Sequence, residues 1–175
     1  MSSNLATFYL SVLVAILFFI VINVFRQVLK TRKLEGSFSK LRNKLTKEAG
    51  TAQEYYELAS IYTDKKLYSQ ATTLYNKAIK AAQKEKEEDN VALIYNGLGY
   101  ISFAQEQYDL AIRNYKEALK ISPNYVTALN NIGHAYEKKQ LNEQALSAYE
   151  DVLKLEPKNT TAKRRAQSLR RLVTA

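Results

Sequence analysis

Apolar residues follow two different patterns along this chain. From Leu5 to Phe25 they form a continuous run that contains no charged residue and consists mostly of Leu, Ile, Val and Phe. From residue 52 onward they recur at helical intervals among polar and charged residues, which is typical of amphipathic helices that bury one face. Five glycines and two prolines in 175 residues leave few helix breakers. The sequence therefore predicts an all-α chain, with one long apolar helix ahead of a stack of amphipathic helices.

The amphipathic part contains the same pattern twice at a constant offset. The first copy is Tyr95, Leu98, Gly99, Tyr108, Ala111, Tyr115, Ala118, Leu119 and Pro123. The second copy is Leu129, Ile132, Gly133, Asn142, Ala145, Tyr149, Val152, Leu153 and Pro157. The offset and the order of residue types resemble the tetratricopeptide repeat, a helix–turn–helix unit with a period of roughly 34 residues that stacks on copies of itself. The resemblance implies a binding module and does not name its partner.

A third copy of the pattern lies earlier in the chain, at an offset that is longer by six positions. It consists of Tyr55, Leu58, Ala59, Tyr62, Tyr68, Ala71, Tyr75, Ala78 and Ile79. The extra positions fall in the charged run at 84–90, so we expect the second helix of this repeat to be longer by a turn or more. Asp89 or Asn90 would then cap the next helix. The resemblance implies a right-handed superhelix of three repeats, in which the three tyrosines at 75, 115 and 149 fill the space between repeats.

The apolar run at the amino terminus has the length of a membrane span. As a helix it would be about 31 Å long, against roughly 30 Å of hydrocarbon. A cleavable signal peptide fits less well, because no charged residue precedes the run and no small–x–small site follows it. Four basic residues follow at once and predict that the carboxyl side stays in the compartment of synthesis. These membrane-flanking residues are Arg26, Lys30, Arg32 and Lys33.

The sequence divides into four segments, with basic regions on both sides of the repeats. We expect an anchor at 1–30, a basic linker at 31–50, three repeats at 51–157 (52–88, 92–125 and 126–159), and a basic capping helix at 158–175. In the linker, Gly36 should break the helix and Ser37 should start a short amphipathic one, which either covers the first repeat or lies on the membrane surface. The last helix either caps the stack or offers a basic patch for lipid headgroups, RNA or an acidic protein.

Charge and composition exclude several kinds of function. The net charge is +6 for residues 1–50, −3 for 51–157 and +6 for 158–175. The repeats therefore carry no basic stripe for nucleic acid, which argues against nucleic-acid binding. There is no cysteine and only one histidine, and no Gly-rich phosphate loop follows a strand. We therefore expect no catalytic residues, no cofactor, no metal site and no small-molecule substrate.

The register of the repeats exposes a set of residues that the repeat pattern does not explain. Family resemblance implies that one face of each first helix lines a concave groove where partners bind. On that face lie the nine predicted groove residues: Tyr56, Ser60, Thr63, Asn96, Tyr100, Phe103, Asn130, His134 and Glu137. Aromatic rings flanked by amides suit a peptide; alternatively, Tyr56, Tyr100 and Phe103 merely pack beneath neighbouring helices. His134 is expected to be a hydrogen-bonding residue and not a metal ligand. Only Lys138 adds a positive charge here, which argues against binding of acidic chaperone tails.

The whole chain resembles the membrane-anchored tetratricopeptide proteins of cyanobacteria and red-algal plastids that assist photosystem I assembly or stability. This resemblance implies a single-pass protein of the thylakoid membrane, with a lumenal amino terminus and with repeats in the stroma or cytoplasm that hold photosystem I subunits or assembly intermediates. Two alternatives stay open. One is an anchored import or targeting receptor, and the other is a tether whose basic ends bind lipid or nucleic acid.

Overall fold

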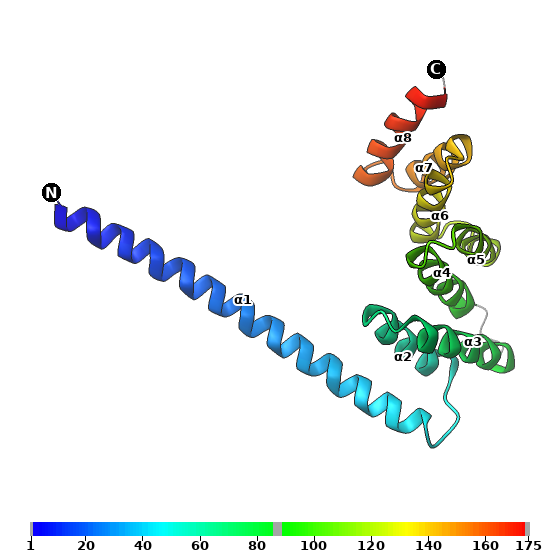
Figure 1. Cartoon of the computed structure of the whole chain (residues 1–175), viewed down its shortest axis with the longest axis horizontal. Coiled ribbons are helices and arrows are strands. Elements are labelled where there is room, and N and C mark those ends of the chain that lie inside the picture. The colour runs from blue at the N-terminus through cyan, green and yellow to red at the C-terminus, as the bar shows by residue number, and fades with distance from the viewer. Residues whose placement is uncertain (1, 86–88, 174–175) are drawn as a thin grey trace. The chain divides into compact units, whose positions relative to one another are not determined.

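The computed structural model describes residues 2–85 and 89–173, and these residues form helices without strands (Figure 1). The chain divides into two compact units, Met1–Lys47 and Glu48–Ala175. The all-α fold predicted from the sequence is confirmed.

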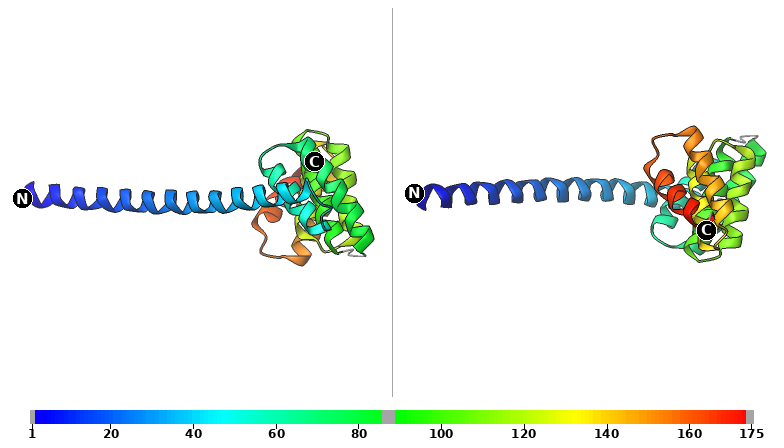
Figure 2. Two further views of the ribbon diagram at one scale, coloured as in Figure 1. Left: turned by 90° about the horizontal axis from the view of Figure 1, so that it is seen from below. Right: turned by 90° about the horizontal axis from the view of Figure 1, so that it is seen from above.

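The first unit is one helix, α1 (Ser2–Leu45), which is continuous in both views of Figure 2. Within it, Thr7–Leu29 is long and apolar enough to cross a membrane, with a mean hydropathy of 2.7 and none of it buried. Its polar side chains bond to the helix itself: Ser11 Oγ donates to the Phe8 carbonyl, and Asn23 Nδ2 donates to the Phe19 carbonyl, each at 2.8 Å. Such bonds lower the cost of placing polar groups in an apolar medium.

The expected helix break at Gly36 was wrong, because α1 continues through it to Leu45. A glycine inside a helix costs only about 1 kcal/mol relative to alanine. Good helix formers precede Gly36 and follow again from Lys40, so one such penalty does not end the helix. The expected short amphipathic helix after Ser37 is thus the last part of α1.

The second unit consists of three helix pairs and a final helix, stacked in chain order (Figure 1). The pairs are α2 (Ala52–Asp64) with α3 (Tyr68–Glu85), α4 (Asp89–Ala104) with α5 (Tyr108–Ile121), and α6 (Val126–Lys138) with α7 (Asn142–Leu155); α8 (Thr160–Val173) follows. Helix α3 has 18 residues, whereas α5 and α7 have 14 each. The expected lengthening of the first repeat is therefore present. Glu87 and Glu88 lie outside the described residues, and α4 already includes Asp89.

Helix ends follow local sequence signals. Thr51 and Glu54 form a capping box at the start of α2, and Asn159 Oδ1 accepts the Ala162 amide at 3.0 Å at the start of α8. Helices α5 and α7 both end two residues before a proline, as the missing amide of proline requires. The turn inside each repeat uses a left-handed residue, with φ near 60° in all three. These residues are Lys66, Glu106 and Gln140.

The core is built around one tyrosine per repeat. Tyr115 and Tyr149 are 1% exposed, and each ring lies against the glycine of the first helix in its own repeat, at Gly99 and Gly133. Each tyrosine also shares a cluster with the next element: Tyr115 with residues of α6, and Tyr149 with residues of α8. The expectation that these rings fill the space between repeats is borne out by this packing.

Candidate functional site: the inner face of the first helices

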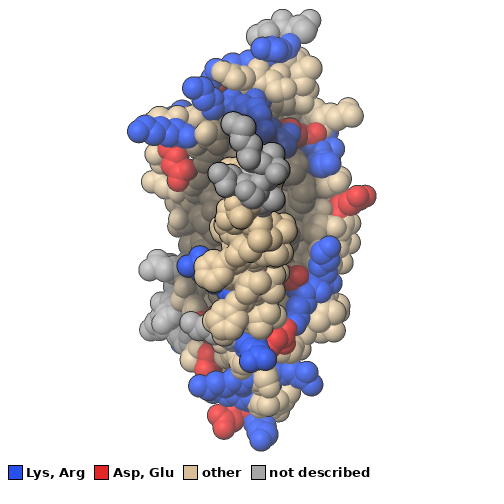
Figure 3. Space-filling view, turned by 90° about the vertical axis from the view of Figure 1, so that its left-hand side faces the viewer, with Lys and Arg blue, Asp and Glu red and all other residues tan. Residues whose placement is uncertain are grey.

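The nine predicted groove residues lie on α2, α4 and α6, three on each helix at spacings of four and three residues. This spacing puts the three residues of each helix on one face. The three helices follow one another along one side of the stack (Figure 1). The space-filling view from that side shows a hollowed surface on the second unit, with Lys and Arg gathered at its α8 end (Figure 3). We call this side the inner face.

Contacts between repeats join two pairs of residues on the inner face. The rings of Phe103 on α4 and His134 on α6 lie 4.7 Å apart, centroid to centroid. Asn96 Oδ1 on α4 accepts a hydrogen bond of 3.0 Å from Asn131 Nδ2 on α6. The second and third repeats therefore share a continuous aromatic and amide surface. Of the amide pair, the repeat register predicted only Asn96 and missed Asn131.

The three aromatic residues differ in how open they are. Tyr100 is 50% exposed, whereas Tyr56 and Phe103 are half-buried. The Tyr56 ring lies 5.9 Å from the Tyr75 ring, and burial raises the pKa of its hydroxyl. Phe103 packs edge-on against Tyr108 at 5.4 Å. Tyr56 and Phe103 therefore pack against neighbouring helices, as the alternative interpretation expects. Tyr100 is the one of the three that is open to solvent.

Two polar residues of the set bond to their own helix. Thr63 is 8% exposed and donates its hydroxyl to the Ala59 carbonyl at 2.9 Å. Asn130 Nδ2 donates to the Val126 carbonyl at 3.1 Å, and Asn130 Oδ1 is buried without a hydrogen-bond partner among the described residues. The Thr63 hydroxyl and the Asn130 side-chain amide are therefore bonded to their own helices or buried. Neither is free to pair with a peptide in the way that the groove prediction requires. Ser60 is half-buried and lies close enough to the Tyr75 hydroxyl to influence its pKa.

The carboxylate of Glu137 is paired at the far end of the inner face. Its Oε1 accepts the Tyr149 hydroxyl at 2.6 Å, and its Oε2 accepts Arg165 Nη1 at 2.9 Å. Burial and this hydrogen bond raise the pKa of Tyr149. Arg165 comes from α8, so no local signal along the chain indicates this pair of distant residues. Because the carboxylate and the guanidinium carry opposite charges, the pair contributes little net charge to the inner face.

His134 lies among groups that keep it uncharged near neutral pH. Burial lowers the pKa of its imidazole first, and the neighbouring Arg165 lowers it further, while Glu137 acts in the opposite direction. A neutral imidazole has one donor and one acceptor nitrogen. Among the described residues, no group of three His, Asp or Glu side chains is placed to hold a metal ion.

The fold and the repeats define the class of protein. Family models for the tetratricopeptide repeat match residues 52–85 and 126–159, and a TPR repeat model matches residues 99–140. The first TPR domain of Spaghetti (RPAP3), bound to an HSP90 peptide, is similar with a TM-score of 0.64 and 22% identity, over 73% of this chain and 97% of that one. YrrB, a TPR protein with an unusual peptide-binding site, gives 0.65 and 21%, over 83% and 72%. The chain is a tetratricopeptide-repeat protein.

Curated relatives narrow this class to one family. The ycf37 protein of Cyanophora paradoxa is 38% identical over 173 residues, which cover 99% of both chains. The ycf37 protein of Guillardia theta is 33% identical over 79% of this chain and 77% of its own. The chloroplastic TPR protein PYG7 of Arabidopsis thaliana is 34% identical over 67% of this chain but only 38% of its own length. The chain belongs to the ycf37 family.

Proposed function

We propose that this protein is a non-enzymatic scaffold that assists photosystem I assembly or stability from the thylakoid membrane. The observation that carries the proposal is the inner face, which combines the exposed Tyr100 with a pair of half-buried amides and with a carboxylate that is paired to Arg165. Such a surface suits a peptide segment of a protein partner. Photosystem I is proposed as the partner on the basis of the family resemblance. The chloroplastic relative PYG7 supports a plastid location.

Anchoring gives this surface a mechanism that needs no catalysis. Thr7–Leu29 would hold the protein in the bilayer, and the basic residues after it would keep the repeats on the stromal or cytoplasmic side. Membrane subunits in the same bilayer then meet the inner face at a raised effective concentration. Weak contacts to each partner are sufficient under these conditions.

Individual side chains would recognise a peptide in different ways. Tyr100 offers ring area at a low entropic cost, as aromatic residues do at binding hot spots. Asn96 accepts from Asn131 through Oδ1, and no described residue accepts from its amide nitrogen, which can therefore donate to a partner's backbone carbonyl. Both residues belong to α4, so the middle repeat would make the central contacts.

The test is a pull-down of the full chain from native membranes in mild detergent, with photosystem I subunits as the readout. Tyr100→Ala should reduce their capture by about tenfold or more, because it removes the open ring without touching the core. Leu155→Ala is the matched control, since Leu155 is exposed to a similar degree, 40% against 50%, and lies at the end of a second helix. Capture that Tyr100→Ala leaves unchanged would contradict the groove assignment.

Salt separates this proposal from the tether alternative. Binding through an aromatic and amide surface should largely persist between low and physiological ionic strength, whereas binding through basic ends should collapse. Washing the same pull-down at both ionic strengths distinguishes the two. The import-receptor alternative predicts that precursor proteins, and not photosystem I subunits, are captured by the same face.

A further inference from the structure

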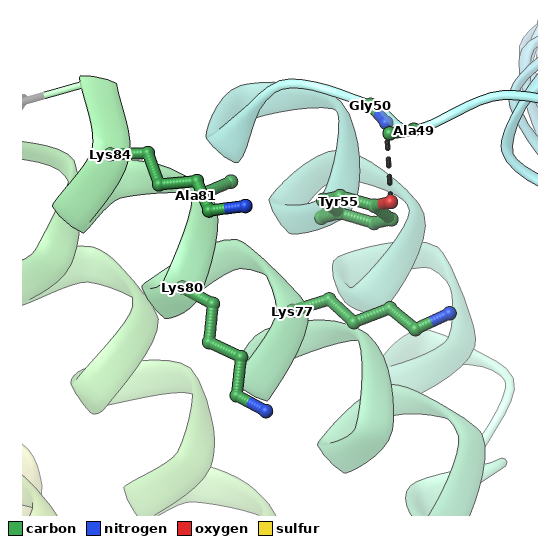
Figure 4. Close-up of a pocket in the computed structure, with 7 residues that line it drawn as sticks. All are labelled: Ala49, Gly50, Tyr55, Lys77, Lys80, Ala81 and Lys84. Carbon is green, nitrogen blue, oxygen red and sulfur yellow. Dashed lines mark hydrogen bonds between the residues drawn. The ribbon is translucent and has the colours of Figure 1, made fainter.

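We propose that the outer end of the first repeat holds a phosphate-binding pocket, filled by the headgroup of an anionic lipid. The cavity has a volume of about 310 Å³ and is lined by Gly50, Tyr55, Lys77, Lys80 and Lys84, among others (Figure 4). We call it the lysine pocket. Its lipid source rests on the membrane anchoring proposed above. Tyr55 belongs to the repeat pattern, but nothing in that pattern requires the three lysines.

The three lysines share one face of α3. Their spacings of three and four residues bring them to neighbouring turns on the same side of the helix. Lys84 lies in the extra turn that makes α3 longer than α5 and α7. None of the three forms an ion pair with a described residue, whereas Lys120 on α5 pairs with Glu117 and Lys154 on α7 pairs with Asp151. Three like charges on one face, none of them in an ion pair with a described residue, favour binding of an anion.

Tyr55 provides a fixed hydroxyl group in this cavity. Its Oη accepts the amide of Gly50 at 3.1 Å, as the dashed line in Figure 4 shows. No described residue accepts the proton of the same hydroxyl, which is therefore available to an anion. Lys77 Nζ lies 5.8 Å from the centre of the Tyr55 ring, within the range of a cation–π contact. The ring thus positions one ammonium group and contributes one neutral donor.

The chemistry of the lining matches a phosphate group. Three ammonium groups and one hydroxyl can donate hydrogen bonds, and none of the described side chains that line the cavity is a carboxylate. A phosphodiester presents several acceptor oxygens and a negative charge, which clusters of lysine and arginine recognise at membrane surfaces. A peptide carboxylate carries the same charge with fewer acceptors and is the competing ligand.

Chain length keeps the lysine pocket within reach of the membrane. From Leu29, where the apolar span ends, 16 helical residues lead to Leu45, and five more lead to Gly50. The helical part is about 24 Å long and the rest spans at most about 18 Å. A tether of this length holds the pocket at a high effective concentration of headgroups. Lipid is therefore favoured over an acidic peptide as the phosphate-bearing partner.

The experiment uses the full chain in lipid nanodiscs and measures the acetylation rate of each lysine by mass spectrometry. Discs of phosphatidylcholine alone are compared with discs that also contain phosphatidylglycerol. We expect acetylation of Lys77, Lys80 and Lys84 to be roughly fivefold slower in the discs that contain phosphatidylglycerol. This factor corresponds to a binding free energy of about 1 kcal/mol per lysine. Tyr55→Phe, which changes no charge, should return much of that reactivity. Inorganic phosphate added to neutral discs should protect much less than the lipid.

A matched set of basic residues controls for diffuse electrostatics. Arg113, Lys116 and Lys120 have the same spacing on α5, but they line none of the cavities described. Equal protection of Lys116 would overturn the lysine pocket in favour of a general surface effect, and so would the absence of protection at Lys77, Lys80 and Lys84. Stronger protection by an oligoglutamate peptide or by free phosphate would overturn the lipid assignment.

Failure of this inference is separable from failure of the proposed function. Changing the three pocket lysines to glutamine should leave capture of photosystem I subunits by the inner face intact. If the chain does not insert into the discs at all, the anchoring itself fails, which a flotation assay detects before any lysine is measured.

Discussion

The first and third repeats share one register and differ in what surrounds their tyrosine. In the third repeat, Tyr149 lies against Gly133 of its own first helix and donates its hydroxyl to Glu137. In the first repeat, Ala59 stands at the position of that glycine, and the Tyr75 ring lies against Gly97 of the following helix. The tyrosine of each repeat thus packs within its own repeat and against the next element, but Tyr149 meets the glycine of its own repeat, whereas Tyr75 meets a glycine of the following one.

The difference extends to charge. The third repeat ends in α8, which pairs Arg165 with Glu137 and Arg170 with Glu150. The outer end of the first repeat carries lysines without ion pairs to described residues. A stack of similar units therefore has two dissimilar ends, one that ion pairs join to α8 and one that carries the proposed anion site.

Removing the central tyrosine should have the largest effect on stability. Tyr149→Ala and Tyr75→Ala each delete a buried ring, 1% and 3% exposed, so each should cost about 3–5 kcal/mol of unfolding free energy. Tyr149→Ala should cost more, because it also removes a hydrogen bond to a charged carboxylate. Urea unfolding of the full chain in mild detergent, followed by circular dichroism, measures both. Tyr149→Phe isolates the hydrogen bond, and equal stability of Tyr149→Phe and wild type would contradict its contribution.

Adding a methyl group at the glycines should reveal how tightly each tyrosine packs. A Cβ at Gly99 would lie 2.5 Å from the Tyr115 ring, whereas one at Gly133 would lie 3.0 Å from the Tyr149 ring. Gly99→Ala should therefore destabilise by about 1–3 kcal/mol through overpacking. Gly133→Ala should be closer to neutral, since the gain in helix propensity of up to about 1 kcal/mol offsets a milder clash. The same unfolding assay ranks the two, and a reversed order would contradict this packing.

The sequence predicted the features that depend on local spacing. The constant offset between copies of the pattern located the repeats, and the charged run at 84–90 predicted the longer α3. The expected break at Gly36 was wrong because a single glycine penalty is small against a long helix. Local signals were therefore sufficient for the repeats and misleading only where one residue competed with many.

The inner face was harder to predict because it depends on contacts between helices. The register identified nine residues, but it could not show that Tyr100 is open while Phe103 packs on Tyr108 and His134. The pair of Glu137 with Arg165 joins residues 28 positions apart, and the lysine pocket forms between α2 and α3. Distances of this kind arise from the stacking geometry, which residue spacing within one helix does not contain.

The turns should behave alike in every repeat, which tests what the repeats have in common. Lys66 and Gln140 both adopt φ of 59°, a left-handed conformation that glycine adopts without a steric cost. Lys66→Gly and Gln140→Gly should each stabilise the fold by about 0.5–1 kcal/mol, after the larger chain entropy of glycine is subtracted. Urea midpoints should shift upward by similar amounts. A gain at one turn only would show that the two ends of the stack unfold separately.

The smallest expected effect is a pH dependence confined to the third repeat. His134 is the single histidine of the chain, and burial, followed by the nearby Arg165, lowers its pKa below the usual 6.5. The folded state therefore binds fewer protons than the unfolded state below that pH. Stability should be complete above about pH 6.5 and should decrease as the pH falls from there towards the folded pKa.

The charged groups that act on this imidazole are Glu137 and Lys138 of α6 and Arg165 of α8. In the first repeat the same register position is Ser60, which does not titrate in this pH range. Urea midpoints at about pH 7.5 and 5.5 should therefore differ less in His134→Gln than in wild type, and the imidazole resonance should titrate at a lower pH in the folded chain than in urea. A midpoint that rises on acidification in wild type but not in His134→Gln would mean that the proton is bound more tightly in the folded state. In that case the pairing with Glu137, and not burial and Arg165, would dominate at this end of the stack.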